Sequence, residues 1–222
     1  MNTLIADLNA LCGVLFLLTA FMMITARQAQ AVLHIFIAQA LLLTASTALL
    51  AVGKRSPELA AIALITLVAK PALIPWLLHR LLSPALRARR EVATTINVPT
   101  SLLIALTISV LAYFLTRPLL DGADAVVAVN LPIGLDVLLL GVYTLAIRRE
   151  ALPQLLSLMV IDNGAFFSGI ALTTSSALVE FAAALAGLMV VMIVALLTRT
   201  IAKLMSSTEV ATLTALREGR KS

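Results

Sequence analysis

The sequence predicts an all-α, polytopic membrane protein with seven transmembrane helices, and two observations support this fold class. The 222 residues are 61% hydrophobic and only 12% charged, with a mean hydropathy of +1.08. Soluble domains have about half apolar and a quarter charged residues. The apolar residues also gather into runs of about 20, the length that crosses a bilayer as a helix. A soluble enzyme, a disordered chain and a disulfide-built secreted module are therefore excluded.

The apolar runs give the order of the predicted helices, and short polar segments separate them. The predicted ranges are 5–26, 30–52, 59–82, 97–116, 126–147, 152–173 and 178–201. A secretory signal begins with basic residues, whereas here Asp7 comes first and no basic residue precedes Arg27. We therefore expect residues 5–25 to be a retained span, and residues 1–222 to form a single integral membrane domain.

The basic residues predict the orientation of the helices. With seven spans, the connecting segments alternate between two sides of the membrane. Twelve of the 16 Lys and Arg residues fall on the side that holds Arg27 and the C-terminal tail, and only Lys54, Arg55 and Arg117 fall on the other. Cytoplasmic loops collect basic residues, so we expect the N-terminus outside, the C-terminus in the cytoplasm, and the chain in a bacterial cytoplasmic (inner) membrane. The net charge of +5 then has no link to nucleic acid, because no basic stripe interleaved with aromatics occurs.

An internal repeat is one interpretation of this order. An offset of 122 residues maps Arg27 onto Arg149 and Glu58 onto Glu180. It would relate two parallel three-helix units, at 1–82 and 126–203, joined by the helix at 97–116. Arginines at helix ends are common, so the alternative is seven helices without a repeat.

Lys70 is an ionisable residue about twelve residues into the third predicted helix, followed by Pro71 and Pro75. A charged side chain at the bilayer centre costs about 2.5–3.5 kcal/mol on insertion scales. Each proline lacks an N–H and displaces the carbonyl four residues earlier, which predicts a kink or break in this helix. Lys70 would then be an ion-relay residue with a pKa altered by burial. The alternative is a structural lysine that satisfies the freed carbonyls or pairs with an acid.

Asp162 and Asp136 also lie deep in predicted spans, each about ten residues from the start. Asp162 begins the element Asp162-Asn163-Gly164, and it shares a helical face with Ala165 and Gly169. We expect close helix packing on this face and interpret Asp162 as a relay carboxylate, or alternatively as the partner of Lys70 or an arginine.

Three further candidates are more weakly indicated. Asp136 follows Pro132 and Gly134, and it either relays ions or has a structural role at a bent helix entrance. Glu180 and His34 are weaker relay candidates, because both are expected near span ends. At such positions the common alternative for Glu180 is a solvated carboxylate at a helix start, which the helix dipole favours. The common alternative for His34 is a histidine that makes hydrogen bonds at the membrane interface.

Cofactor motifs and cofactor ligands are missing from the sequence. The single cysteine and two histidines cannot build a zinc, iron–sulfur or nickel site. No phosphate loop, dinucleotide fingerprint or nucleophile elbow occurs. We therefore expect no cofactor, no metal and no catalytic residue in this chain.

Three stretches together resemble a known family. The segments at 67–75 (LVAKPALIP), 162–164 (DNG) and 213–216 (LTAL) resemble hydrogenase-4 component E, a membrane subunit of formate hydrogenlyase-type complexes, over essentially the full length. The part after Arg148 is similar to subunit K of complex I, a three-helix protein with carboxylates buried in its last two helices. By that likeness Asp162 takes the place of the first carboxylate. The second is missing, because residues 181–197 hold no acid and Glu180 lies too near the outer surface.

The resemblance implies a role in the membrane arm of a complex-I-like or group 4 hydrogenase-type respiratory complex. Ion movement, expected to be of protons, would be coupled to electron transfer in partner subunits. Antiporter-like membrane subunits and soluble redox subunits would be the partners, and these would hold any iron–sulfur clusters, nickel–iron site or quinone. Two alternatives stay open at this point: a purely structural subunit of the membrane arm, and a stand-alone secondary transporter.

Overall fold

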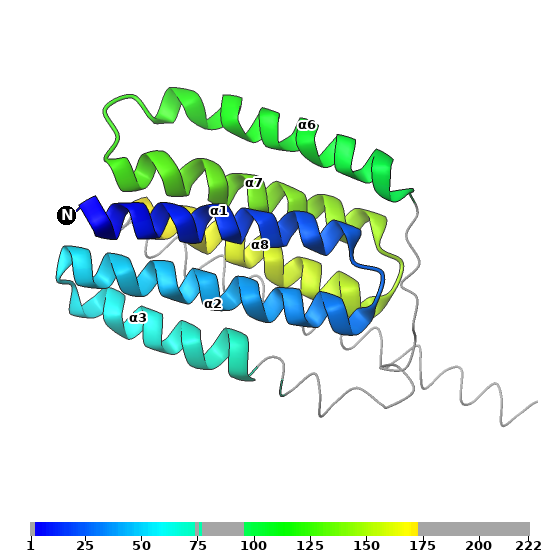
Figure 1. Ribbon diagram of the computed structural model, residues 1–222, viewed down its shortest axis with the longest axis horizontal. Coiled ribbons are helices and arrows are strands. Elements are labelled where there is room, and N and C mark those ends of the chain that lie inside the picture. The colour runs from blue at the N-terminus through cyan, green and yellow to red at the C-terminus, as the bar shows by residue number, and fades with distance from the viewer. Residues whose placement is uncertain (1–2, 74–75, 77–95, 173–222) are drawn as a thin grey trace, which may run out of the picture.

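Long helices, each antiparallel to the next described helix along the chain, build the protein (Figure 1). The computed structural model describes residues 3–73, 76 and 96–172. Its α-helices are α1 (Thr3–Thr25), α2 (Ala29–Lys54), α3 (Pro57–Val68), α6 (Val98–Thr116), α7 (Ala125–Ile147) and α8 (Ala151–Leu172). A π-helical segment, η1 (Ala69–Leu73), continues α3, and a short 3-10 turn, η2 (Arg117–Leu119), follows α6. Four of the described helices, α1, α2, α6 with η2, and α7, are long and apolar enough to cross a membrane.

Helices occupy the first six predicted ranges as far as the structure describes them. Their bounds differ from the expected ones by at most two residues, apart from the ends of the third and sixth ranges, which are described only to Leu73 and Leu172. Because hydrophobic runs and polar punctuation locate helices but not their last turns, small differences of this size follow from fraying at helix ends. The seventh range, 178–201, lies outside the described residues.

The connection between α2 and α3 is a tight turn. Arg55 adopts a left-handed conformation with a φ of 51°, and the amide of Ser56 donates to the main-chain oxygen of Ala51 at 3.1 Å. The hydroxyl of Ser56 accepts from the amide of Leu59 at 3.3 Å. Pro57 occupies the first turn of α3, where a missing N–H costs nothing. Serine and proline therefore start α3 where α2 has ended.

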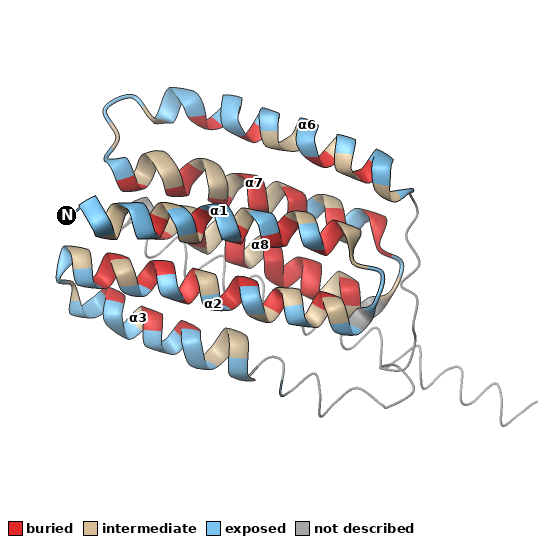
Figure 2. Cartoon of the chain, in the orientation of Figure 1, coloured by how far each residue is buried: buried red, intermediate tan, exposed pale blue. Residues whose placement is uncertain are grey.

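The core lies between the α1–α2 and α7–α8 hairpins. Phe16 of α1 and Phe167 of α8 stack with ring centroids 4.7 Å apart, and both are fully buried. In Figure 2 buried residues line α7, α8 and the inward faces of α1 and α2, whereas α6 is exposed along most of its length. Figure 1 shows α6 and α3 at opposite edges of the bundle.

Glycines bring α7 and α8 into backbone contact. A Cβ added to Gly164 would lie 2.4 Å from the amide nitrogen of Leu138, and one added to Gly134 would lie 2.5 Å from that of Ser168. Close approach through small residues is a common way of packing helices in membranes. The close packing predicted beside Asp162 therefore occurs at Gly164. At Gly169, where we expected it, a Cβ would meet no described atom within 4 Å.

The helix bounds agree with the predicted offset of 122 residues. Applied to α1, the offset gives both ends of α7, and applied to the start of α2 it gives the start of α8. The pairing inside each hairpin agrees too: Ser46 donates to the side chain of Asn9, and Ser168, 122 residues later, approaches the main-chain oxygen of Leu131 at 3.4 Å. The structure thus places two helices of each proposed unit at matching positions, and the repeat stays an interpretation of the sequence. The third helix of the second unit lies outside the described residues.

Candidate functional site

Lys70 and Asp162 form an ion pair between η1 and α8. The Nζ atom of Lys70 lies 2.6 Å from Oδ2 of Asp162, and their side chains are 15% and 22% exposed. These residues are 92 positions apart in the chain, so the pair depends on the packing of η1 against the bundle. Among the described residues it is the only ion pair. Both residues were predicted as relay candidates, and pairing was the alternative considered for each.

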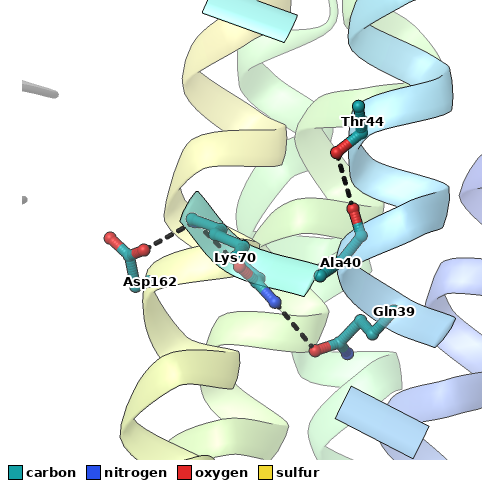
Figure 3. Close-up of polar contacts among 6 residues, drawn as sticks. Gln39, Ala40, Thr44, Lys70 and Asp162 are labelled. Carbon is teal, nitrogen blue, oxygen red and sulfur yellow. Dashed lines mark hydrogen bonds and ion pairs between the residues drawn. The ribbon is translucent and has the colours of Figure 1, made fainter. Parts of the chain in front are cut away.

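Two amide side chains extend the pair into the bundle (Figure 3). Lys70 also donates to Oδ1 of Asn163 at 2.8 Å, and the amide of Asn163 donates to Oε1 of Gln39 on α2 at 3.2 Å. Asn163 and Gln39 are fully buried, and Nε2 of Gln39 has no partner among the described atoms. Three elements thus contribute one continuous polar chain, which we call the Lys70 chain: Gln39, Asn163, Lys70 and Asp162.

The aromatic ring of Phe166 completes the surroundings of Lys70. The Nζ atom of Lys70 lies 5.1 Å from the centre of the Phe166 ring, within the range of a cation–π contact. Thr44, drawn near Gln39 in Figure 3, donates to the main-chain oxygen of Ala40 at 2.9 Å and so stays within α2. Lys70 is therefore held by an acid, an amide and an aromatic face.

The helix that carries Lys70 changes its geometry at that residue. Regular α-helix ends at Val68, and residues Ala69–Leu73 form a π-helix. Pro71 cannot donate a main-chain hydrogen bond, and a wider helical turn accommodates such a missing bond. The structure thus has an irregularity at the predicted place. Pro75, the second proline of that prediction, lies outside the described residues.

The charges of Lys70 and Asp162 depend on each other. The ionised pair has no net charge, and each member cancels most of the field of the other. Removing either partner leaves an uncompensated charge in a poorly solvated site, which is strongly unfavourable. The pair is therefore a unit in which each charge requires the other.

Asp136 lies apart from the Lys70 chain. It is buried in α7, and its Oδ1 atom is 3.0 Å from the hydroxyl of Ser109 on α6. α7 is one uninterrupted helix through Pro132, so Asp136 lies within the helix and not at a bent entrance. The structure does not bring Asp136 into hydrogen-bond contact with Lys70 or Asp162.

Neither of the two weaker candidates, His34 and Glu180, is part of the Lys70 chain among the described residues. His34 is exposed on α2 and makes no hydrogen bond to a described residue. Glu180 lies outside the described residues. Within those residues no group of three or more His, Cys, Asp or Glu side chains could hold a metal ion.

A second buried polar cluster was missed by the sequence analysis. Asn9 on α1 donates to Oδ1 of Asn130 on α7 at 2.7 Å and accepts from the hydroxyl of Ser46 on α2 at 2.6 Å. All three residues are buried, and Nδ2 of Asn130 has no partner among the described atoms. An asparagine inside an apolar run was the available signal, because an amide in a membrane needs a partner.

Arg148, one of the twelve basic residues counted on one side of the membrane, is buried at the end of α7. It is 2% exposed, and its Nη2 atom donates to the main-chain oxygens of Met23, Ile24 and Ala26 at 2.6, 3.2 and 2.8 Å. These carbonyls at the C-terminal end of α1 have no partner within the helix. Burial lowers the pKa of the guanidinium, and the negative charge of Glu150 opposes that shift. Arg148 therefore fastens α7 to the end of α1.

Comparison with known proteins gives one relative of similar length. The uncharacterized protein Rv0085 of Mycobacterium tuberculosis is 25% identical to this chain over 202 residues, which are 90% of this chain and 92% of that protein. No protein-family model matches the chain. No solved structure matches it either.

Proposed function

We propose that this chain is an ion-translocating membrane subunit of a complex-I-like or group 4 hydrogenase-type respiratory complex. The observation that carries the proposal is the Lys70–Asp162 ion pair, which joins a π-helical interruption to a neighbouring helix. Charged residues inside a membrane are costly and commonly mark ion pathways. Irregular backbone at that depth requires surrounding protein or a wet cavity. In this protein a charged residue and an irregular helical turn occur together at Lys70.

The Lys70 chain supports an ion-relay role in particular. Gln39 has an unpartnered amide hydrogen at the buried end of the chain, and Asp162 is partly exposed at the other. A proton that moves along such a chain requires donors and acceptors in sequence, and the amides can orient intervening water. The protein thereby offers a path between its interior and its surface.

The remaining parts of the proposal rest on the sequence. Likeness to hydrogenase-4 component E implies antiporter-like and other membrane-arm subunits as partners, with redox cofactors in soluble subunits. We further propose seven spans, an outside N-terminus and a bacterial inner-membrane location, from the charge distribution and the apolar runs. Electron transfer in the partners would supply the free energy, and this chain would contribute part of the ion path.

The first experiment identifies the partners. The tagged chain is extracted from its native membrane in a mild detergent, and co-purifying proteins are identified by mass spectrometry. We expect large antiporter-like membrane proteins together with iron–sulfur or hydrogenase-like subunits. A chain that purifies alone, as a monomer or homodimer, would contradict the proposal and favour a stand-alone secondary transporter.

Substitution of the ion pair then tests the relay. In inside-out vesicles supplied with the electron donor of the partners, proton uptake is followed with a pH-sensitive dye, with and without Na⁺. We expect Lys70→Met and Asp162→Asn to leave electron transfer and subunit assembly in place but to abolish dye quenching. Lys54→Met and Asp7→Asn are matched controls, because these side chains are exposed at helix ends. Unchanged pumping in both pair variants would refute the relay.

A purely structural role for the pair is the second candidate. It is favoured by how completely Lys70 is satisfied, since Asp162 and Asn163 both accept from its ammonium group. The exchange variant Lys70→Asp with Asp162→Lys distinguishes the two roles, because it keeps an ion pair but reverses its direction. A structural pair predicts assembly and full pumping in the exchange variant. A relay predicts assembly without pumping.

A further inference from the structure

The hydroxyl of Ser109 lies within hydrogen-bond distance of two oxygen atoms, one of Asp136 and one of the main chain, but it has only one hydrogen to donate. The hydroxyl oxygen of Ser109 lies 3.0 Å from Oδ1 of Asp136 and 3.1 Å from the main-chain oxygen of Ala105, one helical turn earlier. Both neighbours are acceptors when Asp136 is ionised. A hydroxyl has a single hydrogen and can donate to only one of them. The protonation state of Asp136 therefore decides how the three groups bond.

Two arrangements satisfy these distances. If Asp136 is ionised, the Ser109 hydroxyl is its only hydrogen-bond donor among the described residues, and the approach of Ser109 to Ala105 goes unused. If Asp136 is protonated, it donates to the Ser109 oxygen and Ser109 donates to Ala105. Each of the two hydroxyl hydrogens then makes a hydrogen bond. An isolated buried carboxylate is far more costly than a hydrogen-bonded neutral acid. The second arrangement is the favoured one.

No cation compensates Asp136 in the described structure. Its helix α7 packs against α1, α6 and α8, and these four helices contain no lysine, arginine or histidine. Their other titratable side chains are Asp7, Cys12, Tyr113, Tyr143 and Asp162. Asp162, the other acid in the middle of a helix, is held by Lys70. The two mid-helix acids thus have opposite environments, one with a cation and one with a hydroxyl.

We propose that Asp136 is a proton-binding site, held as a neutral carboxylic acid at neutral pH, and that lipophilic carbodiimides modify it. These reagents partition into membranes and react with protonated acids. The acid gives its proton to one nitrogen of the carbodiimide, and its oxygen bonds to the central carbon. The resulting O-acylisourea rearranges to a stable N-acylurea, with no other reactant consumed. This inference concerns the chain alone, and it stands whether or not the chain belongs to a redox-driven complex.

Access from the lipid side is consistent with this chemistry. Asp136 is only 5% exposed, but the helix that covers it, α6, presents most of its surface outward (Figure 2). A hydrophobic reagent therefore has one helix to pass at that edge of the bundle. Asp162 differs because its carboxyl is engaged by the ammonium group of Lys70 at 2.6 Å.

The test is carbodiimide labelling of the full chain in native membranes at neutral pH, followed by peptide mass spectrometry. We expect one added carbodiimide on the peptide that contains Asp136, none on that of Asp162, and no label in Asp136→Asn. In Lys70→Met, Asp162 has lost its cation and is labelled as well. Label on Asp162 but not on Asp136 in the wild type would overturn the assignment, as would protection of Asp136 by Na⁺ but not by choline.

Infrared spectroscopy gives an answer that does not depend on reagent access. A protonated carboxyl has a carbonyl stretch that an ionised one lacks, so the difference between wild type and Asp136→Asn isolates the state of this residue. We expect the wild type to show the additional band at neutral pH. Identical spectra in that region would mean that Asp136 is ionised and would overturn the proposal, whatever the labelling result.

Discussion

The α1–α2 and α7–α8 hairpins begin their helices in the same register at an offset of 122 residues but are held together differently. In the second hairpin Gly134, Gly141 and Gly164 bring the two backbones into contact. An offset of 122 residues replaces these glycines with Cys12, Thr19 and Leu42 in the first hairpin. There, side chains separate the helices, and the Asn9–Ser46 hydrogen bond links them. One arrangement of two helices is thus stabilised by close backbone packing in one case and by buried polar contacts in the other.

This difference bears on the Lys70 chain. Asp162 and Asn163 sit directly before Gly164, on the helix whose backbone is fixed against α7. Gln39, on α2, is reached only through its side chain. The α7–α8 hairpin therefore positions Asp162 through backbone packing, and the α1–α2 hairpin supplies the Gln39 amide through a side-chain contact.

The largest expected effect comes from filling the backbone contact. Gly164→Val places a branched side chain where even a Cβ would lie 2.4 Å from the Leu138 nitrogen. Because backbone atoms cannot move aside cheaply, we expect a loss of about 3 kcal/mol or more in the free energy of unfolding. Unfolding in mixed detergent micelles measures it. Gly169→Ala is the matched control, with no described atom within 4 Å. Equal stability of both variants would mean that α7 and α8 are not in backbone contact.

An intermediate effect is expected from the polar contact of the first hairpin. Asn9→Ala removes two hydrogen bonds and leaves Asn130 and Ser46 without a partner for them. We expect a loss of about 1–2 kcal/mol in the free energy of unfolding. Ser168→Ala, which removes the long 3.4 Å contact at the corresponding position of α8, should cost less than about 0.5 kcal/mol. The reverse order would show that the two hairpins are stabilised alike.

The smallest effect is expected at the glycine of α1. A Cβ on Gly13 would approach the terminal carbon of the Ile133 side chain at 3.0 Å and the ring of Phe167 at 3.3 Å. A flexible side-chain end can give way, and alanine favours a helix over glycine by about 1 kcal/mol. We therefore expect Gly13→Ala to change the free energy of unfolding by less than about 0.5 kcal/mol, in the same micelle assay. A loss as large as that of Gly164→Val would place a close backbone contact between α1 and the α7–α8 hairpin.

Sequence reasoning located the described helices well, because a membrane span is determined by hydropathy and length alone. It also identified Lys70 and Asp162, since an ionisable residue in an apolar run stands out. It left open whether they pair, because contacts between distant segments depend on helix packing. Gly164 carries no charge and barely alters hydropathy, so its backbone contact could not be found by composition. Asn9 gave a visible signal, an amide inside an apolar run, but its partners depend on helix packing. The burial of Arg148 could not be read from the sequence, because an arginine at a span end normally faces water.

The connections between the described helices have a consequence for the order of folding. Three residues join α1 to α2, two join α2 to α3, and three join α7 to α8. Such short links force neighbouring helices to pair as soon as both exist, without a search. The bonds from Asn9 to Asn130 and from Arg148 to Met23 span 121 and 125 positions of the chain. In the first hairpin, the amide hydrogens of Asn9 and the carbonyls at the end of α1 therefore gain these partners only after most of the protein has been synthesised.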